Sequence, residues 1–306
     1  MYYLVYGFLY LISLLPLRLL FTVSDGIYLL VYYVIGYRRD VVMYNLGIAF
    51  PEKSRAEKIS ISKKFYRNFI DNFIETIKML SASDDYLRKH CSGNFELLNE
   101  LHETGRSCNV LLGHNFNWEL ANHVVSTEIV YNFLVVYMPI SSQAINRLFL
   151  KLRSRGRTKL LSAHNMRRDM LPFRNLPYVL TLVADQNPPF PNRAYWLNFF
   201  GKPAPFVTGP EKSARASNLV VLFGHIEKVK RGYYRIVMTV QEEHPGTLPE
   251  GAITVKYARY MEEVIRKNPS LWLWTHRRWK HGWQPGYEKL WVDDQPLLPV
   301  HPEQTS

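Results

Sequence analysis

A histidine and a glutamate five residues apart are the first candidates for chemistry in this sequence. His114 directly follows the apolar run 109–113, and Glu119 lies five positions further on. A histidine beside a carboxylate can act as a general base, because the imidazole takes a proton from an attacking hydroxyl while the carboxylate holds the tautomer. Five residues along one helix separate two side chains by about 140°, so the pairing requires His114 in a loop and Glu119 in the first helical turn.

The spacing alone is weak evidence, because ten histidines and 26 acidic residues produce the same spacing twice more. His123 and Glu128 fall inside an expected helix, where their side chains point apart. His164 and Asp169 have two arginines between them, which compete for the carboxylate. Both matches are interpreted as ordinary core or surface histidines.

Three further segments carry residues suited to a site. Residues 151–159 place lysine or arginine at every second position, which indicates either a solvated face or an arginine clamp for phosphate or carboxylate. Asp185 and Gln186 follow the apolar run 178–184, and polar residues at such a strand end line sites in α/β proteins, although a plain turn is the alternative. Residues 271–280 (LWLWTHRRWK) are typical of a lipid headgroup interface or of an amphipathic strand with a solvated basic end.

Short apolar runs alternate with helical stretches, which predicts an α/β fold with a mixed sheet flanked by helices. Functional loops of such sheets gather at the carboxyl ends of the strands. Residues 199–204, which begin Phe-Phe-Gly, are interpreted as a loop lining an apolar groove or as core packing. The expected strands are 109–113, 131–137, 159–162, 178–184, 219–223 and 233–240, the last antiparallel, and the expected helices are 54–80, 117–126, 142–155, 165–171 and 210–217.

The N-terminal residues are apolar enough to meet a membrane. Residues 1–17 contain no charged side chain, and a second apolar run, 27–36, ends before two arginines. The first run is short for a span of about 20 residues, so a single anchor, a hairpin in one leaflet and a buried helix pair all remain open. The basic residues that follow favour a cytoplasmic body. The chain is therefore divided into an anchor, 1–36, and a catalytic domain, 37–306.

The overall charge indicates anionic partners. The chain has 306 residues, of which 47% are hydrophobic, and a formal charge of +12. This excess favours an acidic membrane surface, an acidic carrier protein or nucleic acid. No nucleic-acid motif accompanies it, so nucleic acid is not an expected partner. The two cysteines, Cys91 and Cys108, form neither a disulfide framework nor a metal-ligand spacing.

In their order and spacing, these motifs resemble the late acyltransferases of lipid A biosynthesis, the lauroyl and myristoyl transferase family. The resemblance extends over most of the chain, and its most specific part is the segment 272–280. The matching residues are Arg39, Asn45-Leu46 and Phe50-Pro51; His114 with Glu119; Arg153 with Arg155; Asp185-Gln186; and Phe199-Phe200-Gly201 with Thr208-Gly209. Asn268-Pro269-Ser270 stands where many relatives carry Pro-Glu-Gln, which leaves the acceptor lipid open.

The resemblance implies a glycerolipid-acyltransferase-like fold with an N-terminal anchor in the inner membrane and a catalytic domain facing the cytoplasm. Such an enzyme moves a fatty acyl chain from acyl carrier protein, or coenzyme A, to a hydroxyl of a lipid A precursor, without cofactor or metal. His114 would be the base and Glu119 its partner. Arg153 is expected to grip a phosphate, with Asp185 holding that arginine or the acceptor sugar. The other expected substrate-binding residues are Arg155, Gln186, Asn115 and Trp118.

Two alternatives to this function remain open at the level of the sequence. One is an acyltransferase for another membrane lipid, such as an aminoacyl lipid or a glycolipid. The other is a non-enzymatic protein that binds membranes through its basic, aromatic surface, in which case His114 and Glu119 are dispensable.

Overall fold

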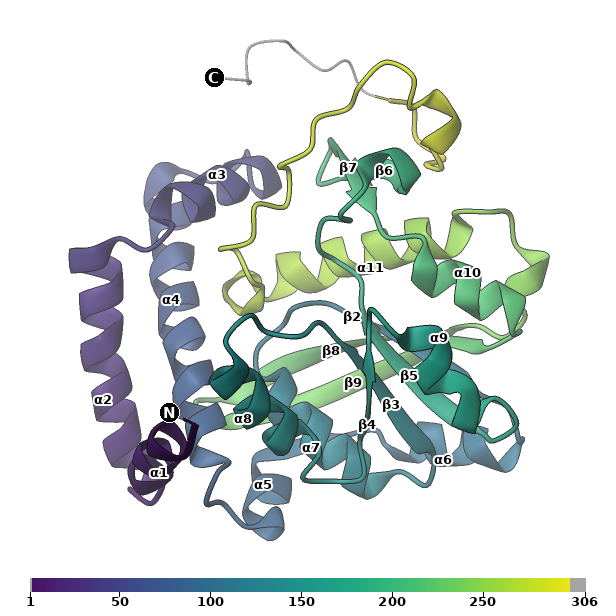
Figure 1. The fold of residues 1–306 in the computed structure, drawn as a ribbon. Coiled ribbons are helices and arrows are strands. Elements are labelled where there is room, and N and C mark those ends of the chain that lie inside the picture. The colour runs from purple at the N-terminus through teal and green to yellow at the C-terminus, as the bar shows by residue number, and fades with distance from the viewer. Residues whose placement is uncertain (1, 298–306) are drawn as a thin grey trace.

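A seven-stranded mixed sheet lies at the centre of the computed structural model, which describes residues 2–297 (Figure 1). The strand order is β1-β9-β8-β2-β5-β3-β4. β8 and β9 are antiparallel, and the other neighbouring strands are parallel. The strands are β1 (Cys91–Gly93), β2 (Cys108–Leu112), β3 (Asn132–Tyr137), β4 (Lys159–Ser162), β5 (Tyr178–Val183), β8 (Val220–Lys230) and β9 (Tyr233–Glu242).

The six strands expected from apolar runs are all present, and the antiparallel sense of β9 is confirmed. β1 was not expected, because three residues carry no periodic signal. The segment 199–204 belongs to a separate hairpin of β6 (Tyr195–Phe199) and β7 (Lys202–Phe206). Phe199 and Phe200 are buried, so core packing is the correct interpretation of that segment.

Helices cover both faces of the sheet, with α5, α6 and α7 on one face and α10 and α11 on the other (Figure 1). Alternate strand residues serve the two cores, since Val110 packs into one and Leu111 into the other. The helices are α3 (Arg39–Ala49), α5 (Asp84–His90), α6 (Glu96–Glu103), α7 (Trp118–Glu128), α8 (Gln143–Arg153), α9 (Met166–Met170), α10 (Gly209–Ala216) and α11 (Ala252–Lys267). Shorter turns are η2 (Leu171–Phe173), η3 (Pro191–Arg193), η4 (Pro245–Thr247), η5 (Pro269–Leu271) and η6 (Glu288–Leu290).

The long helix α4 (Arg55–Lys78) begins at a capping box in which Ser54 and Glu57 satisfy each other's backbone N–H groups. Its aromatic residues recur every four positions, and each such step turns by about 40° around the helix. The repeat therefore drifts, so that Phe65 is buried whereas Phe73 is 46% exposed.

The N-terminus forms two apolar helices that pack on the body of the protein. α1 (Tyr2–Ser13) packs on α4 and α8, and α2 (Leu17–Leu29) packs along α4. A π-helical segment, η1 (Leu30–Ile35), continues α2, and together they are long and apolar enough to cross a membrane. Only 22% of that window is buried, which leaves a continuous apolar face exposed and makes it a candidate membrane anchor.

Candidate active site

The parallel pairing of β2 with β5 brings the two most promising polar residues together. Leu112 lies opposite Val183 in the register, so His114 and Asp185 follow at adjacent strand ends. His114 Nδ1 lies 2.5 Å from Asp185 Oδ1, and the backbone N–H of His114 donates to Asp185 Oδ2 over 2.8 Å. The histidine is therefore held by one carboxylate at two points.

Asp185 is completely buried and remains an anion. Burial alone would raise its pKa, but the electrostatic attraction and hydrogen bonds of His114, together with the N–H of Trp272, outweigh burial and hold the pKa below its ordinary value. Trp272 Nε1 donates to Asp185 Oδ2 over 2.6 Å. Since an ionised carboxylate only accepts, the His114 proton is assigned to Nδ1, which leaves the Nε2 lone pair free to take a proton.

The close approach of the two strand ends depends on a residue without a side chain. A methyl group added to Gly113 would lie 2.2 Å from Met261 Cε and 3.1 Å from Asp185 Oδ2. Glycine here leaves room for the carboxylate beneath the histidine loop.

His114 lines a cavity of about 540 Å³ between the sheet and α7. Most of its wall is aliphatic or aromatic and comes from β2, β3, β5 and α7. The apolar residues nearest the centre of the sheet include Val110, Phe133, Val135 and Val179, with Val125 opposite them on the helix. The lining of the cavity suits an apolar ligand, and the His114 imidazole stands at its wall.

Glu119 occupies the first turn of α7, as its pairing with a loop histidine would require, but its carboxylate binds a different residue. Arg153 Nε donates to both Glu119 oxygens over 3.1 Å, and Arg153 Nη2 donates over 2.8 Å. Burial raises the pKa of Glu119, and Arg153 opposes that effect. The guanidinium also lies over the ring of Trp118 at 4.3 Å.

The four polar groups are thus paired differently from the expectation. His114 contacts Asp185 in place of Glu119, and within residues 2–297 no hydrogen bond or ion pair joins Asp185 to Arg153. The reason is that β5 delivers its carboxylate from 71 residues away, whereas Glu119 is turned toward α8.

The alternating basic run is not a uniformly solvated face, because its three arginines bind neighbouring elements. Arg155 donates to the carbonyls of Met79 and Ala82 and to Asp84, and it is not among the residues that line the cavity. Arg157 donates to the last carbonyls of α7, which is a helix C-cap. Three arginines of the run therefore hold neighbouring elements together.

The segment 271–280 does not form a lipid headgroup interface, because its aromatic residues are buried. Trp272, Trp274 and Trp279 all pack in the core, and Arg278 has no exposed surface. Arg278 Nη1 donates to Asn187 Oδ1, and burial lowers the arginine's pKa to about 10. The segment therefore supports the pair of His114 and Asp185, which we call the dyad, through the contact of Trp272 with Asp185. The sequence did not reveal this role.

Some of the remaining candidate residues line the cavity and others do not. Gln186 and Trp118 line the cavity, whereas Asn115 is buried and pairs with the backbone of Trp272. His123 is a buried histidine whose Nε2 lies 3.2 Å from Asp84 Oδ1, as expected for an ordinary core histidine. Asp169 binds Arg168, as expected for a solvated helix face.

Comparisons with known proteins identify the family of this chain. A search of the curated proteins finds none that matches the chain. A profile described as bacterial lipid A biosynthesis acyltransferase matches residues 1–281, which include both members of the dyad, the cavity and the supporting C-terminal segment. This chain belongs to the bacterial lipid A biosynthesis acyltransferase family and is an enzyme that transfers acyl groups.

Proposed function

We propose that the enzyme transfers a fatty acyl chain from the thioester of acyl carrier protein, or of coenzyme A, to a hydroxyl of a lipid A precursor. The product carries a secondary acyl chain. The observation that supports this most is the His114–Asp185 dyad at the wall of an apolar cavity of about 540 Å³. Ligand pockets typically measure about 300–1,000 Å³, so the cavity has room for a lipid chain.

The chemistry needs one proton to move twice. His114 Nε2 takes the proton from the acceptor hydroxyl as its oxygen attacks the thioester carbonyl carbon. Asp185 stabilises the imidazolium that forms, because its carboxylate stays ionised against Nδ1–H. The tetrahedral intermediate then expels the sulfur, the new ester forms, and the imidazolium returns the proton to the leaving thiolate.

The Glu119–Arg153 pair is proposed to shape the cavity beside the base. Arg153 lines the cavity and has part of its donor set committed to Glu119. A guanidinium fixed in this way presents its remaining N–H groups in one orientation, which suits the phosphate of a pantetheine arm or of the acceptor.

The membrane helices are proposed to lie in the inner-membrane interface, with the catalytic domain on the cytoplasmic side. Charged partners run along the whole of α2 and η1: Lys63 lies over Tyr33 at 5.5 Å, Arg67 over Tyr28 at 5.0 Å, and Ser24 donates to buried Asp71. A spanning orientation would carry these groups into hydrocarbon, where ionised side chains are costly. An interfacial orientation buries only the exposed apolar face, including Leu19, Val23, Ile27 and Val34.

The test is acyl transfer by the purified full-length chain in non-ionic detergent, followed by mass spectrometry of the acceptor. We expect one added acyl chain on a lipid A precursor, with acyl carrier protein and coenzyme A thioesters supplied separately to identify the donor. His114→Ala should lower turnover by at least about 10²-fold. The matched control is His164→Ala on the exposed surface, which should leave turnover unchanged. Transfer to aminoacyl lipids or glycolipids alone would reject the proposed acceptor, and activity of His114→Ala above a tenth of wild type would reject the base.

A further inference from the structure

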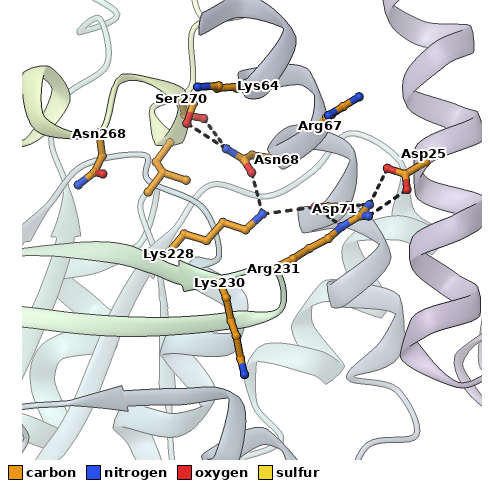
Figure 2. A pocket seen from close by; sticks show the side chains of 11 residues that line it. Asp25, Lys64, Arg67, Asn68, Asp71, Lys228, Lys230, Arg231, Asn268 and Ser270 are labelled. Carbon is orange, nitrogen blue, oxygen red and sulfur yellow. Dashed lines mark hydrogen bonds and ion pairs between the residues drawn. The ribbon is translucent and has the colours of Figure 1, made fainter.

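A second cavity, of about 510 Å³, lies between α2, α4 and the β8–β9 hairpin (Figure 2). We call it the basic cleft, because its walls carry five cations, Lys64, Arg67, Lys228, Lys230 and Arg231, against two carboxylates, Asp25 and Asp71. Five cations against two carboxylates leave a charge of +3 uncompensated at the cleft. The cleft is separate from the acyl cavity and shares none of its lining residues.

The two carboxylates are already occupied by Arg231. Its guanidinium donates to Asp25 through two bonds of 2.9 Å and to Asp71 through bonds of 2.7 and 3.0 Å. Lys228 Nζ donates to Asn68 Oδ1 over 2.7 Å and reaches Asp71 at 3.4 Å. Figure 2 shows these contacts as a continuous chain from α2 to the hairpin. The chain fixes the shape of the cleft without neutralising it.

Three of the other cations, Lys64, Arg67 and Lys230, have no acidic partner within residues 2–297. Lys64 is exposed at the cleft, and Arg67 has only the ring of Tyr28 beneath its guanidinium. Lys228 keeps one N–H beyond its two contacts. In Figure 2 the Lys230 side chain points away from the others, and it lies over the Tyr233 ring at 4.2 Å. Lys64, Arg67 and Lys228 therefore supply the cleft with N–H donors of the kind that bind phosphate.

The position of the cleft adds a second constraint on its ligand. On one side the cleft is bordered by Asp25 of α2. The helix α2 also carries the exposed apolar face on its surface. On the other side its wall is Leu271, whose carbonyl accepts the backbone N–H of Phe116 in the histidine loop over 3.2 Å. A ligand in this cleft thus meets the membrane helix and one wall of the catalytic loop.

We propose that the basic cleft binds the phosphate group of an anionic lipid whose chains lie beside α2. The phosphate is held by Lys64, Arg67 and Lys228, while Arg231 keeps the walls in place. The phosphate belongs either to the acceptor lipid or to another lipid of the same leaflet. Only the choice between these two sources rests on the proposed function.

Binding of a soluble lipid probe tests the proposal without reference to activity. Dihexanoyl phosphatidic acid, titrated into full-length protein in non-ionic detergent, should bind saturably to the wild type. Lys64→Ala with Arg67→Ala should weaken that binding at least tenfold. The control double variant is Arg55→Ala with Lys89→Ala, which removes the same charge from exposed positions outside the cleft and should bind like wild type.

Three results would overturn the proposal. One is equal weakening in both double variants, which would mean a diffuse charge effect. Another is inorganic phosphate competing as well as the lipid, which would make the cleft a free-phosphate site. The third is unchanged probe binding with a raised KM for acyl carrier protein, which would assign the cleft to the carrier. If the double variant unfolds, Lys64→Ala alone replaces it, because Lys64 is exposed and has no acidic partner within residues 2–297.

Kinetics then identify the source of the phosphate. If the acceptor supplies the phosphate, removing it with a phosphatase should raise the wild-type KM for the acceptor at least tenfold. The same treatment should not further raise the acceptor KM of the double variant. If another lipid supplies the phosphate, the wild-type KM for the acceptor should not change when the acceptor phosphate is removed, and the probe should still bind. Absence of all acyl transfer by the wild type would reject the proposed function, but it would leave the binding result standing.

Discussion

Two carboxylate substitutions separate the catalytic partner of His114 from its structural neighbour. In Asp185→Asn the shape is kept, and an amide oxygen at the Oδ2 position still accepts from the His114 backbone and from Trp272. The amide NH₂ then faces Nδ1 and donates to it, so the imidazole proton moves to Nε2 and the base is lost. We expect turnover to fall by about 10²–10⁴-fold.

The two substitutions should affect stability in the opposite order to turnover, with the larger loss of stability at Glu119. Asp185→Asn loses the charge-assisted bond to Nδ1, which is worth about 1.5–3 kcal/mol. Glu119→Gln leaves the guanidinium of Arg153, only 9% exposed, without its counter-ion. Breaking a buried ion pair in this way costs about 3–5 kcal/mol. The substitution at Glu119 should therefore destabilise the protein more than the substitution at Asp185.

The assay is turnover at saturating donor, measured beside urea unfolding of the same preparations in detergent. A third variant, Glu119→Leu with Arg153→Met, removes both charges and should regain most of the stability lost in Glu119→Gln. The reasoning is refuted if Glu119→Gln unfolds like wild type yet loses turnover as severely as Asp185→Asn. That result would make Glu119 the partner of His114 in the reacting enzyme.

The other predictions concern pH, membrane contact and support of the dyad. Burial raises the pKa of Glu75 to about 7, so its contribution to stability is full below its ordinary pKa of 4.5 and is lost as pH rises through 7. Thermal unfolding of Glu75→Gln between pH 5 and 8 should show a flatter profile than wild type, and parallel profiles would contradict this. Val23→Asp on the exposed face of α2 should weaken co-sedimentation with phosphatidylglycerol vesicles at least tenfold, whereas Val130→Asp, on exposed surface elsewhere, should not. Trp272→Phe removes one donor to Asp185 and should lower turnover about tenfold with KM unchanged, because one charge-assisted bond is worth about 1.5–3 kcal/mol.

The sequence predicted the elements of the sheet well, because buried strands are short apolar runs between turn signals. It also predicted that His114 stands in a loop at a strand end, and the structure agrees. The partner of His114 could not be predicted, since nothing in the runs says that β2 and β5 are neighbours. A carboxylate five residues away was visible in the sequence, whereas one 71 residues away required the strand order.

Burial was the other quantity that the sequence did not reveal. Alternating tryptophans next to arginines have the same composition at a membrane surface and in a polar core. In this fold Trp274 donates to the carbonyl of Pro269, and Arg278 stacks over Phe206 at 4.2 Å and donates to Asn187, so both side chains lie inside the protein. The alternating basic run misled for a related reason, because its arginines bind backbone carbonyls that no sequence pattern displays.

One turn of α4 connects the N-terminal helices to the loop that carries His114. Lys78 donates to the carbonyls of Ser13 and Leu15, where α1 gives way to α2, over 2.8 and 3.0 Å. Glu75, three residues earlier, accepts from Asn117 over 2.6 Å in the loop that carries His114. If the N-terminal helices tilt in response to bilayer thickness or lateral pressure, we therefore expect α4 to move with them and to shift the position of His114. We expect turnover in nanodiscs to vary with the acyl length of the host lipid. Turnover that does not change with that length would show that α4 does not couple the N-terminal helices to His114.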